Sequence, residues 1–91
     1  MRFFTTPAFE RSLKALDKVR RKRAVETLET FIKSVEAHEG TPGLGLKQLR
    51  HGIWEIRSGL TDRILLRRYK DALQFIIIGT HDEIRRHLRN L

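Results

Sequence analysis

The short apolar run Phe75-Ile76-Ile77-Ile78 constrains the fold of this 91-residue chain more than any other feature. Successive side chains of a strand point to opposite faces of its sheet, so a strand over residues 73–78 is apolar on both faces. Such a strand needs cover above and below, which predicts a central position in the sheet. The run is far shorter than the ~20 apolar residues of a transmembrane helix. The N-terminus also lacks the long apolar stretch of a signal peptide, and we expect a cytoplasmic protein without a membrane partner.

The first half of the chain has the pattern of one strand followed by two helices. Residues 2–6 are rich in Phe and Thr and predict a short strand. Thr6-Pro7 then provides an N-cap and a first helical residue, and Asp17 can cap a second helix. The expected apolar stripe of the second helix repeats with a 3.6-residue period and consists of Val25, Leu28, Phe31, Ile32 and Val35. Residues 39–45 are rich in glycine and predict a loop.

The second half has the pattern of three strands followed by a helix. We expect strands over residues 53–57, 63–69 and 73–78, with turns between them. Thr80 and Glu83 form a capping-box pattern that predicts a short final helix, with Ile84, Leu88 and Leu91 on one side. The order β-α-α-β-β-β-α predicts an α+β fold in one domain over residues 1–91. In that fold an antiparallel sheet packs on an N-terminal helical pair, with a short C-terminal helix.

The composition excludes several kinds of site and favours an acidic partner. The chain has 19 Lys and Arg against 11 Asp and Glu, a net charge of +8 with neutral histidines. A basic domain of this size suits nucleic acid or an acidic protein. The absence of cysteine excludes disulfides, thiolate zinc sites and cysteine nucleophiles. No histidine pair has a helical metal spacing with a carboxylate third ligand, and no glycine-rich loop has the phosphate-binding pattern. We therefore expect neither a metal site nor a cofactor.

Strand alternation predicts a group of charged side chains on one face of the sheet. If Trp54, Ile56, Ile64 and Leu66 face the core, the opposite face carries Glu55, Arg57, Arg63 and Arg67. His81 follows the last strand, and His87 lies on the final helix. A carboxylate or imidazole can take the proton of an RNA 2′-hydroxyl, another acid can protonate the leaving oxygen, and arginines can hold the phosphate.

The same residues also have plainer interpretations. A Glu between arginines on a strand is more often a solvated ion-pair face, and a histidine near a helix start is often structural. The run Arg20-Arg21-Lys22-Arg23 could contact nucleic acid, although such a run is more often a solvated helix face. At this point both kinds of interpretation stay open.

Three segments of the sequence resemble the RelE/ParE superfamily, the toxins of bacterial and archaeal type II toxin–antitoxin modules. They are Leu46-Lys47-Gln48-Leu49-Arg50-His51-Gly52-Ile53-Trp54-Glu55-Ile56-Arg57, Asp62-Arg63-Ile64-Leu65-Leu66 and Phe75-Ile76-Ile77-Ile78-Gly79. The expected order of elements is also that of the family. The first segment is the most specific, and it is most similar to the HigB-like and RelE-like branches that cleave mRNA.

The resemblance implies an endoribonuclease that cuts mRNA, usually on the ribosome, and thereby inhibits translation. The implied partners are a cognate antitoxin, mRNA and the ribosome, with operator DNA bound only through the antitoxin complex. The implied catalytic positions are Glu55, Arg57, Arg63, His81 and His87. Further RNA contacts are expected at Lys47, Arg50, Arg67, Arg20, Arg21, Lys22 and Arg23. RelE carries lysines at the positions of Glu55 and Arg57, and an arginine and a tyrosine at those of His81 and His87.

Two other functions share this fold or this charge. The ParE branch poisons DNA gyrase and is not a nuclease, and it generally lacks a full catalytic set. An inactive basic module could instead act with an antitoxin as a co-repressor. The presence of Glu55, Arg57, Arg63 and two late histidines favours the nuclease.

Overall fold

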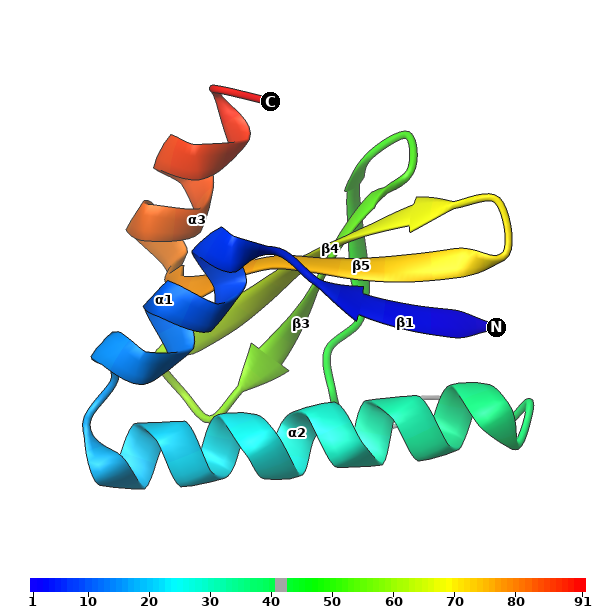
Figure 1. The fold of residues 1–91 in the computed structure, drawn as a ribbon, viewed down its shortest axis with the longest axis horizontal. Helices are drawn as coiled ribbons and strands as arrows, with labels where there is room; N and C mark the ends of the chain where they lie inside the picture. Colours follow the sequence, from blue (N-terminus) through cyan, green and yellow to red (C-terminus); the bar gives the residue numbers. More distant parts are fainter. Residues whose placement is uncertain (41–42) are drawn as a thin grey trace.

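The computed structural model describes residues 1–40 and 43–91. These residues fold into one five-stranded sheet and three helices (Figure 1). The elements are β1 (Arg2–Thr5), α1 (Pro7–Ala15), α2 (Lys18–Glu36), β2 (Lys47–Arg50), β3 (Ile53–Ser58), β4 (Asp62–Tyr69), β5 (Ala72–Thr80) and α3 (His81–Leu88). The predicted α+β class is confirmed. The observed order is β-α-α-β-β-β-β-α, with one strand more than predicted.

The sheet is mixed, with the strand order β1-β5-β4-β3-β2. Strands β2 to β5 pair antiparallel, which confirms the predicted antiparallel meander, and the first strand β1 joins the sheet parallel to β5, so the sheet is not antiparallel throughout. The additional strand β2 lies at the edge of the sheet, and a register shift interrupts its pairing between Gln48 and Arg50. Its sequence, KQLR, has one apolar residue and thus no alternating pattern that would predict a strand.

Helices α1 and α2 cover one face of the sheet and enclose the main core. Helix residues Phe9 and Phe31 are buried there against the strands, and both rings lie with their centroids 6.0 Å from the Phe75 ring. The strand residues on this face are Ile56, Ile64, Leu66, Leu73, Phe75 and Ile78, with the half-buried Trp54 beside them. The predicted core face of the β3–β4 hairpin is therefore confirmed.

Helix α3 covers part of the opposite face. Its buried Ile84 packs with Ile53, Leu65 and Ile76, one residue from each of β3, β4 and β5. Strand β5 therefore has α1 on one side and α3 on the other (Figure 1), which explains why its sequence is apolar on both faces. It is an internal strand next to the edge strand β1, whereas the centre of the sheet is β4.

The expected helix starts are confirmed by their hydrogen bonds. The Thr6 hydroxyl accepts from the Phe9 amide and the Asp17 carboxylate from the Arg20 amide, each at 2.9 Å. Thr80 and Glu83 form the expected reciprocal capping box at the start of α3. Within residues 1–40 and 43–91, no helix has both the length and the apolar character needed to cross a membrane.

Two apolar residues do not lie where the periodicity predicted. Val25 is 39% exposed, because the buried line of α2 consists of Ala24, Thr27 and Phe31. Ala24 lies one position earlier and is fully buried, so Val25 is turned by ~100° around the helix toward solvent. Leu91 is 43% exposed, because α3 ends at Leu88 and leaves Leu91 beyond its last turn.

Candidate functional site

The β3–β4 hairpin brings Arg57 and Arg63 side by side on the face that carries α3. The two residues are directly opposed in the antiparallel register, and Glu55 is opposed to Leu65 two positions further along. Directly opposed Cβ atoms are ~4.5–5.5 Å apart, and like charges on opposed residues are unfavourable, so an anion bound near both arginines would stabilise this arrangement. This arginine pair is a natural site for a phosphate, which arginine binds with two parallel hydrogen bonds.

A glycine turn before β2 lies against the Arg57 side chain. The Arg57 amide donates a 2.7 Å hydrogen bond to the Leu44 carbonyl. Gly45 has a φ of +61°, and a Cβ atom at this position would collide with the guanidinium of Arg57. The positive φ favours glycine here, and a larger residue would also displace the Arg57 side chain from its present position.

A buried ion pair anchors the start of β4, where Arg63 lies. The Asp62 carboxylate is 1% exposed and accepts from Arg20 Nε at 2.9 Å and Nη2 at 2.6 Å. The hydrogen bond with Asp62 raises the pKa of Arg20 above its ordinary value. Arg63 Nη1 in turn donates to the Asp62 carbonyl at 2.9 Å. The pair joins α2 to the beginning of the strand that positions Arg63.

Glu55 lies on the same face and is 9% exposed. Its neighbours across the two strand pairs are Lys47 on β2 and Leu65 on β4. Among residues 1–40 and 43–91, no cation lies within ion-pair distance of the Glu55 carboxylate. The carboxylate is therefore not committed to a structural ion pair and can accept a proton.

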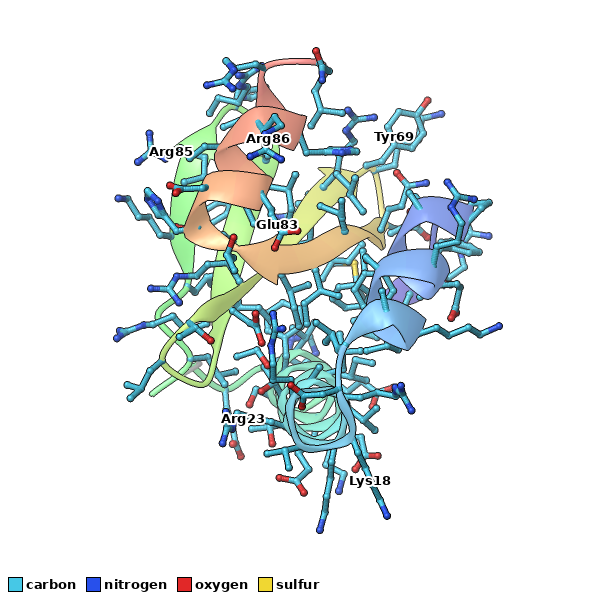
Figure 2. The ribbon with its side chains drawn as sticks, turned by 90° about the vertical axis from the view of Figure 1, so that its left-hand side faces the viewer. Lys18, Arg23, Tyr69, Glu83, Arg85 and Arg86 are labelled. Carbon is cyan, nitrogen blue, oxygen red and sulfur yellow. The ribbon has the colours of Figure 1, made fainter. Side chains whose placement is uncertain are left out.

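His81 is the first residue of α3 and interacts with the cation one turn later. Arg85 Nε donates to His81 Nε2 at 3.3 Å, and His81 Nδ1 lies 3.5 Å from an Asp82 carboxylate oxygen. In this contact Nε2 is the acceptor, so the Arg85 guanidinium occupies the position that a proton acceptor of the substrate would need to take. Sequence reasoning missed Arg85, although its i+4 spacing from His81 is a signal for such a pair. In Figure 2, Arg85 lies on the side of α3 nearer the green strands.

His87 lies on another side of α3 than His81. It lines a shallow pocket of about 210 Å³ together with Ile77, Glu83, Arg86 and Asn90. The two histidines are six positions apart, and six residues turn a helix by ~600°, so they cannot share a face. His81 is therefore hydrogen-bonded to Arg85, whereas His87 shares a pocket with Glu83.

The remaining residues expected to contact RNA are dispersed. Arg50 Nη2 donates to the Leu88 carbonyl at the end of α3, at 3.2 Å, and Arg67 lies beside Gln74 of β5. In the α2 run, Arg20 binds Asp62, and Arg21 donates to the Leu16 carbonyl at 2.8 Å. Lys22 and Arg23 are exposed on the same helix, which packs on the face opposite Glu55. Across the described part of the chain, no group of three His, Cys, Asp or Glu could hold a metal ion.

No family model matches the sequence, and no curated protein sequence matches it significantly. Solved structures match over most of the chain. The RelB–RelE antitoxin–toxin complex from Methanococcus jannaschii matches with a TM-score of 0.72 and 20% identity over 92% of this chain and 96% of that one. YafQ from Escherichia coli strain BL21(DE3) matches with a TM-score of 0.63 and 14% identity over 92% and 98%.

A third structure, the YoeB/ParE toxin from Agrobacterium tumefaciens, matches with a TM-score of 0.64 and 22% identity over 89% of this chain and 99% of that one. In all three structures the matched chain is covered along nearly its whole length. At these identities the likeness is one of fold. The chain therefore shares the fold of these RelE, YafQ and YoeB/ParE structures.

Proposed function

We propose that this protein is the toxin of a type II toxin–antitoxin system and acts as an endoribonuclease on mRNA. The observation that carries the proposal is the arrangement of Glu55, Arg57 and Arg63 on one sheet face, with His81 at the start of the helix that covers that face. These groups suffice for RNA cleavage, because the attacking group is the 2′-hydroxyl of the RNA itself. The chemistry then requires two proton-transfer groups and a cationic phosphate site.

In the proposed reaction, Arg57 and Arg63 bind the non-bridging oxygens of the scissile phosphate. Glu55 takes the proton of the 2′-hydroxyl as its oxygen attacks phosphorus. A bond forms between the 2′-oxygen and phosphorus, and the bond to the 5′-oxygen of the next nucleotide breaks. His81 gives a proton to that departing 5′-oxygen. The products are a 2′,3′-cyclic phosphate and a 5′-hydroxyl, with no net change in protons.

Arg85 has a defined role in the proposed reaction. In the unliganded protein it donates to His81 Nε2. A bound phosphate is a stronger acceptor for a guanidinium than a neutral imidazole is. We propose that RNA draws Arg85 away from His81, which frees Nε2 to face the departing 5′-oxygen.

The proposed protein partner is an acidic antitoxin. Structures with this fold include complexes with RelB and with DinJ, which are antitoxins. The net charge of +8 suits an acidic segment that competes with RNA for the arginine-bearing face. Contact with operator DNA would then come through the antitoxin, and mRNA and the ribosome are the proposed targets of the free toxin.

The test is the single-turnover cleavage of an mRNA, both free and bound to ribosomes, by the parent and an Arg63→Ala variant. We expect the variant to lose about 10²–10³-fold in rate, as when one charge-stabilising donor is removed. Arg11→Ala is the matched control, because Arg11 is an exposed arginine on α1. Equal rates for parent and Arg63→Ala would contradict the proposed site. Gyrase inhibition without RNA cleavage would instead support the ParE-like function.

A further inference from the structure

A second site on the α3 face lies at the other end of the β4–β5 hairpin. It is a pocket of about 310 Å³ lined by Arg2, Phe4, Arg67, Tyr69, Ala72 and Gln74, called here the aromatic pocket. This volume is at the lower end of the ~300–1,000 Å³ range of ligand pockets. We propose that the aromatic pocket binds one nucleobase of the RNA substrate, at a distance from the cut. The inference rests on the proposed function, because it assumes that RNA is the substrate.

The aromatic side chains of the pocket are exposed without contributing to the core. The chain has five Phe, one Trp and one Tyr. Phe4 is 47% exposed and Tyr69 is 64% exposed, and both line the same pocket. The other five rings are buried or half-buried. Exposed aromatic rings beside cations are the usual platform on which single-stranded bases stack, because every base has a π-face.

Both rings lie next to positive charges. The Arg2 guanidinium is 5.4 Å from the centroid of Phe4, and the Lys70 ammonium is 5.6 Å from that of Tyr69. Arg2 also lies 3.6 Å from Asp71, but both side chains are more than two-thirds exposed. An exposed ion pair of this kind contributes little to stability. Arg2 can therefore exchange Asp71 for an RNA phosphate at low cost.

The strand register places a polar side chain, the Gln74 amide, where it could form hydrogen bonds with the edge of a base. Phe4 of β1 is paired with Gln74 of β5, and Gln74 is paired with Arg67 of β4. Gln74 is half-buried, and its amide offers both hydrogen-bond donors and an acceptor. A base that stacks on a ring of the pocket would present its edge to this amide, while Arg67 supplies charge beside it.

The distance to the arginine pair suits one continuous RNA strand. Arg67 and Tyr69 follow Arg63 by four and six residues on β4, which corresponds to about 13 and 20 Å at ~3.3 Å per residue. At ~3.4 Å per stacked nucleotide, the pocket lies within about six nucleotides of the scissile phosphate. In the view of Figure 2, helix α3 lies between Arg85 and Tyr69. Its exposed residues Arg86 and Arg89 can bind the phosphates of an RNA strand that crosses this helix.

The test measures the affinity of the parent and of pocket variants for a short RNA whose cut site is blocked by a 2′-deoxy nucleotide. The RNA is used both free in solution and bound to ribosomes. A series of such RNAs carries one abasic nucleotide at each successive position. We expect one abasic position, within about six nucleotides of the cut, to weaken binding by the parent about 5- to 100-fold. The variants Phe4→Ala and Tyr69→Ala should bind intact RNA with a similar loss and be insensitive to that abasic position. Tyr69→Phe keeps the ring and should rescue binding.

The control is Leu60→Ala, which truncates a 94% exposed apolar residue at the β3–β4 turn. If the parent binds RNA and the pocket variants bind it equally well, the aromatic pocket is not an RNA site and the proposed function stands. If the parent neither binds nor cleaves RNA, the proposed function falls together with the pocket. If Phe4→Ala weakens only antitoxin binding, the pocket is a protein-docking surface and the inference is wrong.

Discussion

Glu55 and His81 differ in how the fold constrains them. Glu55 is 9% exposed on a strand inside the sheet, so its position is set by backbone pairing on both sides. His81 is more than half exposed, and the hydrogen-bond partners of its ring within residues 1–40 and 43–91, Asp82 and Arg85, lie on its own helix. Both groups must lie within hydrogen-bond reach of the proton that they transfer, and both must exchange a proton with solvent between turnovers. The proposed assignment of base and acid therefore needs a substrate that separates the two roles.

Replacing the leaving 5′-oxygen of the RNA by sulfur distinguishes the two roles. A thiolate leaves without protonation, because a thiol has a pKa of ~8.5, far below that of an alcohol. We expect Glu55→Gln and His81→Ala each to lose about 10²–10⁴-fold on ordinary RNA. On the sulfur substrate His81→Ala should regain most of its rate, and Glu55→Gln should not. The measurement is the single-turnover rate with both substrates.

The control for this experiment is His87→Ala, because His87 lies with Glu83 on another side of α3. We expect it to lose less activity than His81→Ala on ordinary RNA. Sulfur rescue of Glu55→Gln instead of His81→Ala would reverse the two roles. A larger loss at His87 than at His81 would contradict the placement of the site on the Arg85 side of α3.

At the scale of elements, the parts predicted best were those with local signals. Strand β5 follows from its apolar run, and the start of α3 follows from Thr80 and Glu83. Strand β2 was missed because an edge strand with one apolar residue has no periodic pattern. The Arg20–Asp62 pair was missed because its partners are 42 residues apart, and only the packed fold brings them together. The run that includes Arg20 was instead expected to contact RNA.

The ion pair gives a prediction for stability. Arg20→Ala would leave the 1% exposed Asp62 carboxylate without its partner. Removing one member of a fully buried pair costs about 3–5 kcal/mol of unfolding free energy, and because Arg20 is 34% exposed we expect a smaller loss of about 2 kcal/mol. Because the pKa of Arg20 is raised in the folded state, its charge contributes fully below the ordinary pKa of arginine, and this contribution is lost as the pH rises above that value. Urea unfolding at neutral pH measures the loss.

Lys18→Ala is the matched control for Arg20→Ala, because Lys18 is an exposed cation in the same first turn of α2. It should change the unfolding free energy by less than about 0.5 kcal/mol. Equal stability of Arg20→Ala and the parent would show that the pair contributes nothing to holding α2 on the sheet. The position of Arg63 would then depend on strand pairing alone.

At the scale of the whole molecule, the two faces of the sheet have separate tasks. One face is closed by α1 and α2 and holds the main core. The other face carries the arginine pair, the aromatic pocket and α3. Its positive charges can attract RNA or an acidic antitoxin. The sequence predicted this division through strand alternation. It did not predict the aromatic pocket, because Phe4 and Tyr69 come from β1 and β4, which lie on either side of β5.

The net charge gives a prediction for antitoxin binding. An acidic antitoxin should associate faster at low salt, because the field of a +8 domain steers it. Raising ionic strength from roughly 0.01 M to 1 M shortens the Debye length from ~30 to ~3 Å. We expect the association rate constant to fall at least about tenfold over this range, as measured by stopped-flow fluorescence. A rate constant that does not change with salt would indicate apolar docking.

The proposed function means that this protein should arrest growth by cutting mRNA with the residues of the α3 face. The most direct test is to map mRNA 5′ ends in cells after brief induction of the parent or of Glu55→Gln. We expect new ends within translated reading frames, bearing 5′-hydroxyl groups, for the parent and not for the variant at equal protein level. Growth arrest by the parent without new mRNA ends, or the same ends with Glu55→Gln, would contradict the account.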